Sequence, residues 1–199
     1  MEVLSYPGDG APRPSGAVVG IGAYDGVHRG HRAIIHEVQR LAEERNCLTA
    51  IVTFDRHPAT VVRPDSAPKL LTDLEQKLEL LEAAGVDVAL VVRFDEERSK
   101  ESAEDFAREV LVGCLGARAV VVGHDFHFGH NRGGNVALLA RLGGEHGFTV
   151  LGLSLVDDGD EAVSSTRIRK LVAAGAVEEA ARLLDRHHEV RGTVVQGDQ

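Results

Sequence analysis

The chain has 199 residues, 43% hydrophobic and 27% charged, a composition typical of one globular domain rather than a disordered, collagen-like or coiled-coil chain. Its 22 Lys and Arg stand against 31 Asp and Glu, a net charge of −9, which argues against a nucleic-acid partner because phosphate backbones attract basic surfaces. Its two cysteines form no paired motif, and no apolar run nears the ~18 residues of a membrane span, so we expect a cytoplasmic protein with no membrane partner.

Short β-branched runs alternate with longer amphipathic stretches, which is the pattern of βαβ units. We expect a flexible N-terminal segment over residues 1–16, followed by one domain over residues 17–186. Near-continuous apolar runs predict strands at 17–21, 49–54, 86–92, 119–122 and 149–155. The stretches between them predict helices at 30–45, 73–84, 103–115, 135–143, 165–174 and 177–184. The sequence thus predicts a doubly wound, Rossmann-like α/β domain with five parallel strands and helices on both faces.

Two segments depart from this alternation. Residues 55–71 contain three prolines and little periodicity, and a connection of this length is more typical of a functional loop than of a spacer. Residues 188–199 alternate like a strand but have no visible partner.

The segment GIGAYDGVHRGH, residues 20–31, joins the first predicted strand to the first predicted helix. Gly26 and Gly30 allow a ligand to approach the backbone closely, and a helix N-terminus presents unpaired N–H groups with partial positive charge. His28 and His31 are three residues apart at the first turn, so both rings can lie on one face next to the same phosphate. This segment predicts an anion site.

A dinucleotide-binding site is an alternative interpretation of the same glycines. Gly20, Gly22 and Gly26 read as GxGxxxG, and Asp55 closes the second strand where a ribose-binding acid would lie. Glycine spacing alone does not decide between the two. The alternative, however, gives no reason for the His28 and His31 pair or for a second polar segment farther along the chain.

That second segment is VSSTRIR, residues 163–169, at the start of a predicted helix. Ser164, Ser165 and Thr166 offer hydroxyl and backbone N–H groups. Arg169 returns to the same face with a guanidinium suited to phosphate. Alone, the segment is explained equally well by an N-cap and a solvated basic face, but together with the first motif it favours phosphate. P-loop, GxSxG and HExxH motifs do not occur.

The segment GHDFHFGH places His124, His127 and His130 at a spacing of three. A zinc site is disfavoured because no cysteine or acidic cluster completes a tetrahedral set on this irregular segment. Phe126 and Phe128 either line a flat pocket or pack in the core, and the sequence leaves both open.

With HxGH at residues 28–31 and SSTxxR at 164–169, the chain resembles the nucleotidyltransferase superfamily. The segments YDGVHRGH, VTFDRHP (52–58) and VVGHDFHFG (121–129) further resemble the adenylyltransferase module of bacterial bifunctional FAD synthetases, over about residues 18–186. The resemblance implies transfer of AMP from MgATP to the phosphate of FMN by direct in-line attack, giving FAD and pyrophosphate. A different acceptor, such as pantetheine phosphate or nicotinamide mononucleotide, or a flavin- or nucleotide-binding module without turnover, remains open.

The resemblance also implies roles for individual residues. The catalytic set would be His28, His31, Ser165, Thr166 and Arg169. ATP would be bound by these residues together with Gly22, Tyr24, Asp25, Gly26, Gly30 and Ser164. FMN would be bound by Phe54, His57, Pro58, Val62, Phe106, Asp125, Phe126 and Phe128, with loop 55–71 as a flap. Magnesium would enter with ATP and need no dedicated protein cage. Positions 23, 24 and 124 depart from the family pattern, with Ala, Tyr and His.

The same resemblance concerns partners. ATP and FMN would be the small-molecule substrates. Members of the family carry a C-terminal riboflavin kinase barrel, and residues 187–199 resemble its opening strand, whereas the kinase motif PTAN is missing from these residues. We therefore expect the first module alone, with a riboflavin kinase domain or partner outside this chain.

Overall fold

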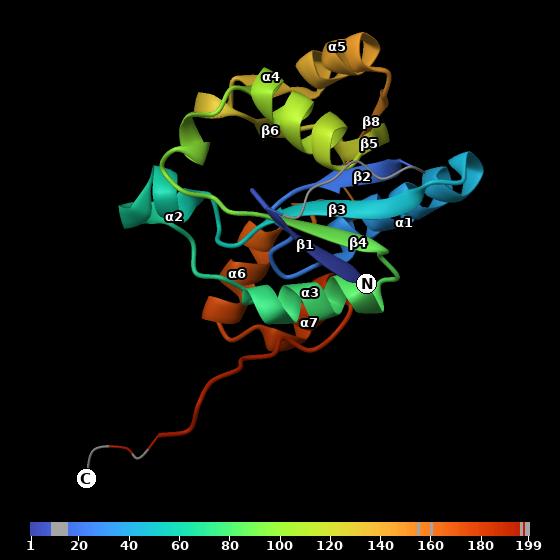
Figure 1. The fold of residues 1–199 in the computed structure, drawn as a ribbon. Coiled ribbons are helices and arrows are strands. Elements are labelled where there is room, and N and C mark those ends of the chain that lie inside the picture. Colours follow the sequence, from blue (N-terminus) through green and yellow to red (C-terminus); the bar gives the residue numbers. More distant parts are fainter. Residues whose placement is uncertain (9–15, 155, 160, 196, 198–199) are drawn as a thin grey trace.

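The computed structural model describes residues 1–8, 16–154, 156–159, 161–195 and 197. Six parallel strands form its central sheet in the order β1-β4-β3-β2-β5-β8, as Figure 1 shows. The strands are β1 (Glu2–Tyr6), β2 (Ala17–Ile21), β3 (Leu48–Phe54), β4 (Val88–Val92), β5 (Ala117–Gly123) and β8 (Thr149–Leu153). The predicted α/β class is confirmed, and the five predicted strands form as the four inner strands and the edge strand β8. Leu155, included in the last predicted strand, lies outside the described residues.

The sixth strand corrects the prediction of a flexible segment over residues 1–16. Residues 2–6 pair in parallel with β4, from Glu2 opposite Val88 to Tyr6 opposite Val92. Leu4 is buried in the main core while Val3 is 47% exposed. An edge strand covered on one face carries few apolar residues, which is why the segment EVLSY lacks the continuous apolar run of an inner strand. Residues 9–15 lie outside the described residues.

All six predicted helices form, with ends within a few residues of those expected. They are α1 (Arg29–Arg45), α3 (Leu74–Ala83), α4 (Ala103–Phe106), α5 (Val136–His146), α6 (Ser165–Ala173) and α7 (Val177–Leu184). The predicted helix 103–115 begins as α4 and continues as a π-helical stretch, Ala107–Cys114. Two short antiparallel hairpins add β6 (His127–Phe128) with β7 (Gly134–Asn135), and β9 (Asp157–Asp158) with β10 (Glu161–Ala162).

Helices cover both faces of the sheet, as predicted (Figure 1). On one face, α4, the π-helical stretch and α5 pack on side chains such as Val19, Val52 and Leu90. On the other face, α1 and α3 cover Val18 and Ile51. Burial of the strands from two sides accounts for their continuous apolar runs.

Loop 55–71 and the last two helices, α6 and α7, pack together near the carboxyl end of the sheet. Loop 55–71 contains the short helix α2 (Ala59–Val62) and a 3₁₀ turn, Pro64–Ser66. Its last residue, Leu71, packs with α6 and α7 in a small separate cluster. This cluster holds the start of α6 next to the ends of the strands.

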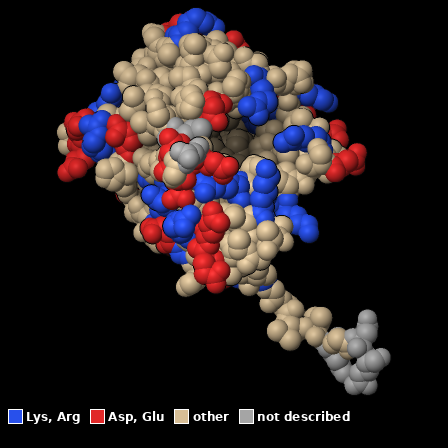
Figure 2. Space-filling model, turned by 180° about the vertical axis from the view of Figure 1, so that it is seen from behind, with Lys and Arg blue, Asp and Glu red and all other residues tan. Residues whose placement is uncertain are grey.

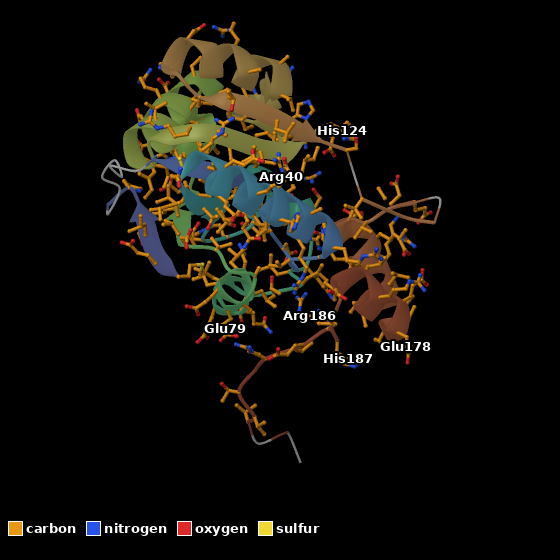
Figure 3. All side chains as sticks on the ribbon, turned by 90° about the vertical axis from the view of Figure 1, so that its right-hand side faces the viewer. Arg40, Glu79, His124, Glu178, Arg186 and His187 are labelled. Atoms are coloured by element: carbon orange, nitrogen blue, oxygen red, sulfur yellow. The ribbon has the colours of Figure 1, made fainter. Side chains whose placement is uncertain are left out.

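Residues 187–195 carry no helix or strand, and they run away from the body of the molecule in Figure 1. Their strand-like alternation finds no ladder partner among the described residues, and a single strand is not stable without one. The start of this tail is held to α3 by an ion pair between Arg191 and Glu79, 2.6 Å apart, and Glu79 faces the tail in Figure 3. Among the described residues, no helix is long and apolar enough to cross a membrane.

Candidate active site

A cavity of about 330 Å³ lies at the carboxyl end of the sheet. It is lined from the ends of β2, β5 and β8 and from the starts of α1 and α6. β2 has β3 on one side and β5 on the other, and the chain visits these neighbours through separate crossovers. Open parallel sheets bind ligands outside the carboxyl ends of the strands at such a switch point. The face of the molecule in Figure 2 is hollowed near its centre, with basic and acidic side chains around the hollow.

Helix α1 begins at the cavity with both predicted histidines. His28 is the N-cap, and its Nδ1 accepts a hydrogen bond from the backbone N–H of His31 at 3.4 Å. The two imidazole rings stack with centroids 3.7 Å apart and planes 16° apart. The buried Tyr24 ring packs on the His31 ring, with centroids 4.9 Å apart and planes tilted by 44°. The rings thus share one face of the helix, as their spacing predicts.

Burial controls the protonation of this pair. His28 is 5% exposed, and burial lowers its pKa to about 4, helped by Arg169 and opposed by the Asp25 carboxylate. Burial also lowers the pKa of His31 well below its ordinary value, with further lowering from His28 and Lys77. Both rings are therefore neutral at pH 7, and each carries one N–H that it can donate. Because His28 accepts through Nδ1, its proton is on Nε2.

The turn between β2 and α1 has an unusual backbone. Tyr24, Gly26 and Val27 have positive φ angles of 50°, 82° and 38°. A Cβ at Gly26 would also lie 2.9 Å from Cδ1 of Leu71, so glycine is needed there for both conformation and space. Such strained turns collect at functional sites because the surrounding structure has to hold them.

Helix α6 faces the same cavity with its first turn. The Ser164 hydroxyl is the N-cap and accepts from the backbone N–H of Arg167 at 3.2 Å. The Ser165 hydroxyl donates to the backbone oxygen of Asp25 at 2.9 Å, which joins α6 to the turn before α1. Arg169 pairs with the Asp25 carboxylate, and its Nε donates to the Lys69 backbone oxygen at 2.7 Å. Two helix N-termini therefore meet at one cavity, which is an arrangement suited to a polyphosphate.

The structure brings most of the predicted nucleotide residues to this cavity. It is lined by Gly22, Tyr24, Asp25, His28, Gly30, His31, Ser164, Ser165, Thr166 and Arg169. Gly26 lies in the turn behind the lining. Of the predicted flavin residues, the cavity includes His57, Asp125 and Phe126.

The other predicted flavin residues lie outside the lining. Phe106 and Phe128 are buried in the main core, with ring centroids 5.9 Å apart, so core packing describes Phe128 while Phe126 reaches the cavity. Phe54 packs edge-on against Phe94 at 5.4 Å. Pro58 is the N-cap of α2, and Val62 is 62% exposed. A flavin role for these side chains stays a prediction.

The sequence pattern did not indicate two further residues, one near His31 and one in the cavity lining. Lys77 of α3 is 7% exposed, and its Nζ donates to the backbone oxygen of Phe54 at 3.1 Å. Its position between Leu74, Leu78 and Leu81 on the apolar face of the helix was the available signal. Ser154, unlike Lys77, lines the cavity, and it follows the carboxyl end of β8, where open parallel sheets bind their ligands.

The three histidines of GHDFHFGH do not converge. Nδ1 of His127 lies 2.8 Å from the backbone oxygen of Asp125, and Nδ1 of His130 lies 3.1 Å from that of Ser99. His124 is exposed beyond the end of β5 and lies at that edge of the sheet in Figure 3. Across the described parts of the chain, no three His, Cys, Asp or Glu side chains form a metal-binding group.

Fold and site together define a Rossmann-like α/β domain in which two helix N-termini face one cavity. A crystal structure from Streptococcus pneumoniae, described as a macrolide-efflux protein, matches all of this chain and 64% of its own length with a TM-score of 0.85. Its sequence identity is 24%, so the likeness concerns the fold alone. The chain belongs to the FAD synthetase family, whose sequence pattern matches residues 11–167.

Curated relatives of the chain include bifunctional riboflavin kinase/FMN adenylyltransferases. The Escherichia coli K12 protein is 37% identical over 184 residues, 92% of this chain and 59% of that protein. The Buchnera aphidicola protein from Schizaphis graminum is 32% identical over 93% of this chain and 60% of its own length. The Listeria monocytogenes protein is 36% identical, over 92% of this chain and 58% of its own length. The chain thus spans about 60% of the length of the relatives it matches.

Proposed function

We propose that the chain is an FMN adenylyltransferase. The observation that carries this proposal is that the HxGH and SSTxxR segments, 133 residues apart between His31 and Ser164, face one cavity in a chain of the FAD synthetase family. A phosphate oxygen of FMN attacks the α-phosphorus of ATP, the bond to the β-phosphate oxygen breaks, and pyrophosphate leaves. The products are FAD and pyrophosphate, and no covalent enzyme intermediate forms. Catalysis then rests on positioning and on charge stabilisation.

His28 and His31 act on the phosphate that is transferred. As neutral imidazoles they donate N–H groups, and the start of α1 adds the partial positive charge of a helix N-terminus. Fixed donors in a buried site stabilise charge that develops in the transition state without having to reorganise. Neutral donors also bind the phosphate without requiring a proton from solution.

Arg169, Ser165 and Thr166 act on the pyrophosphate that leaves. Thr166 and Ser165 lie in the first turn of α6, where backbone N–H groups are unpaired. Arg169 lies one turn later and supplies a guanidinium, which binds phosphate oxygens through several N–H groups at once. This side of the cavity would hold the β- and γ-phosphates of ATP.

We propose that magnesium enters as the MgATP substrate. The Asp25 carboxylate already binds Arg169 and backbone N–H groups, so the residues at this cavity fit an ion held mainly by phosphate oxygens and water rather than by a protein cage. The ion would neutralise charge on the phosphates when bound.

Both cysteines are free thiols, consistent with a reducing, cytoplasmic setting for this reaction.

We place FMN on the side of loop 55–71. His57 of this loop lines the cavity, and its Nδ1 accepts from the backbone N–H of Ala59 at 3.1 Å, which leaves Nε2 as the donor. Asp125 and Phe126 face the same cavity from the end of β5. The phosphate of FMN would reach the histidines from this side, and the flavin ring would lie against the loop.

The decisive experiment incubates the chain with FMN and MgATP and measures pyrophosphate release together with FAD by chromatography. We expect equal amounts of the two products. Pantetheine phosphate and nicotinamide mononucleotide are tested as alternative acceptors, and riboflavin is the control that lacks the attacking phosphate. Binding of FMN and MgATP without any product would contradict the proposal in favour of a binding module, and product from another acceptor alone would change the substrate.

A further inference from the structure

One buried carboxylate joins the two helix N-termini of the site to the loop next to it. Asp25 is 3% exposed. Its side chain accepts hydrogen bonds from the backbone N–H groups of Leu71 at 2.9 Å and Thr72 at 3.0 Å, and from the Thr72 hydroxyl at 3.3 Å. It also forms the ion pair with Arg169. A single side chain thus connects the turn before α1, the end of loop 55–71 and helix α6, which are more than forty residues apart in the sequence.

A direct contact between Asp25 and ATP is disfavoured by charge. Both of its oxygens already accept from protein donors. A carboxylate brought against a polyphosphate repels it, and removing the cation from a buried ion pair leaves an uncompensated charge. Any effect of Asp25 on phosphate binding must therefore pass through the groups that it holds.

The group that it holds most directly is the guanidinium of Arg169. Nη2 of Arg169 donates to Asp25, and Nε donates to the Lys69 backbone oxygen at 2.7 Å. Because the guanidinium is planar and rigid, fixing its Nε and Nη2 by these two hydrogen bonds also fixes the orientation of its plane. Nη1 has no acceptor within the described ranges of the chain, and Arg169 lines the cavity. The side chain is 18% exposed, so it is held before any ligand arrives.

We propose that Asp25 is a positioning residue that holds Arg169 in the orientation in which Nη1 binds the phosphates leaving as pyrophosphate. This inference rests on the proposed function, because it assigns a task to Arg169 in that reaction. Arginine has several rotatable bonds, and a fixed counter-ion removes the need to order it during catalysis. Asp25 also fixes residues 71 and 72, so the end of the flavin-side loop and the pyrophosphate side share one anchor.

A double-mutant cycle tests this role. Asp25→Asn keeps the shape of the side chain and removes its charge, and we expect roughly a ten- to hundredfold loss in kcat/KM for MgATP. Arg169→Met should lose at least as much. In kcat/KM for MgATP the double variant should be no slower than Arg169→Met alone, because on the phosphate side Asp25 acts through Arg169. Losses that multiply in the double variant, or wild-type kinetics in Asp25→Asn, would overturn the inference.

Asp87→Asn is the matched control. Asp87 also accepts from a backbone N–H and a hydroxyl, those of Thr49 at 2.9 and 2.8 Å, but it lies at the amino end of the sheet. Its kinetics should equal those of the wild type. Thermal unfolding adds a second measurement, the change in melting temperature that Asp25→Asn causes when Arg169 is absent. In the Arg169→Met background, Asp25→Asn should raise the melting temperature, since it removes an unpaired buried charge.

A measurement on the wild-type chain keeps the test independent of activity and of variant folding. In ¹H–¹⁵N NMR spectra of the ligand-free chain, the Nη2 protons of Arg169 should exchange slowly with water, because Nη2 donates to the buried Asp25 carboxylate. Fast exchange in the wild type would overturn the inference even if FAD is formed. Slow exchange with no FAD formed would instead support the positioning geometry and contradict the proposed function.

Discussion

Replacing Tyr24 by Phe should stabilise the protein. Tyr24 is fully buried, and its hydroxyl has no hydrogen-bond partner within the described parts of the chain. An unsatisfied buried polar group costs about 1 to 3 kcal/mol. Phenylalanine would remove this group and keep the ring that packs on His31 at 4.9 Å. We expect a gain of about 1 kcal/mol or more in the free energy of unfolding, and a melting temperature ~2–4 °C higher for each kcal/mol gained.

Urea denaturation followed by fluorescence and circular dichroism measures this difference. The only other tyrosine of the chain, Tyr6, is the matched control, because its hydroxyl donates to Glu109 at 2.8 Å. Tyr6→Phe should lower the free energy of unfolding by about 0.5 to 1.5 kcal/mol. A loss of stability in Tyr24→Phe would refute the reasoning, since it would mean that the Tyr24 hydroxyl has a partner such as a buried water.

A second substitution checks the position of the same hydroxyl. A Cβ at Gly20 would lie 2.6 Å from the Tyr24 hydroxyl oxygen and 2.8 Å from Cδ1 of Ile51. Gly20→Ala should therefore destabilise the wild type, and Tyr24→Phe should relieve part of the loss. Simple additivity of the two changes would contradict this contact.

Three further predictions concern the histidines and the arginine of the site. His31→Ala should lower kcat ~10²-fold and change FMN affinity little, because the lost contact acts on the transition state; steady-state kinetics and FMN titration separate the two. Arg169→Ala should weaken MgATP binding measured by calorimetry more than FMN binding, and Arg169→Lys should recover little because an ammonium lacks the guanidinium fork. The pKa of His28 is about 4 when folded and ~6.5 when unfolded, so the unfolded state binds more protons between these values. The stability that His28 contributes should be full above about pH 6.5 and fall by ~3 kcal/mol as the pH drops to about 4. His31, whose pKa burial also lowers, adds to this loss, so His28→Asn should make this part of the curve less steep.

Each of these has a result that contradicts it. Near-normal turnover in His31→Ala would remove this ring from the chemical step. Unchanged MgATP affinity and kcat in Arg169→Ala would show that Arg169 does not bind the phosphates of ATP. A pH dependence between about 4 and 6.5 that is the same in wild type and His28→Asn would mean that His28 does not stay neutral in the folded chain.

The inner part of the fold could be predicted because its local signals are strong. β2, β3 and β4 are buried on both faces, so their apolar runs stand out. The edge strand β1 buries Leu4 and exposes Val3, which leaves a pattern too weak to recognise. The π-helical stretch Ala107–Cys114 was predicted as an ordinary helix, because its apolar spacing fits both.

Some features of the candidate site could likewise be predicted from local sequence patterns, whereas others depend on how distant segments pack. His28 and Ser164 both precede helices that start at the carboxyl ends of strands, so sequence alone suggested a common site. The ion pair of Asp25 with Arg169 depends on how α6 packs against the turn before α1, and no local pattern reports such packing. The placement of Phe128 in the core and of Phe126 at the cavity likewise depends on the path of a short hairpin.

The pairing of β1 with β4 sets an order of events during synthesis. β1 is made before the other strands of its sheet, but its neighbour comes only with residues 88–92. β2 and β3 are complete and able to pair once residue 54 has been made. Long-range parallel pairing closes late because a large loop has to be ordered first. β1 thus waits for β4 while β2 and β3 are already able to pair, and we expect the nascent chain to hold residues 2–6 unpaired until residues 88–92 have been made.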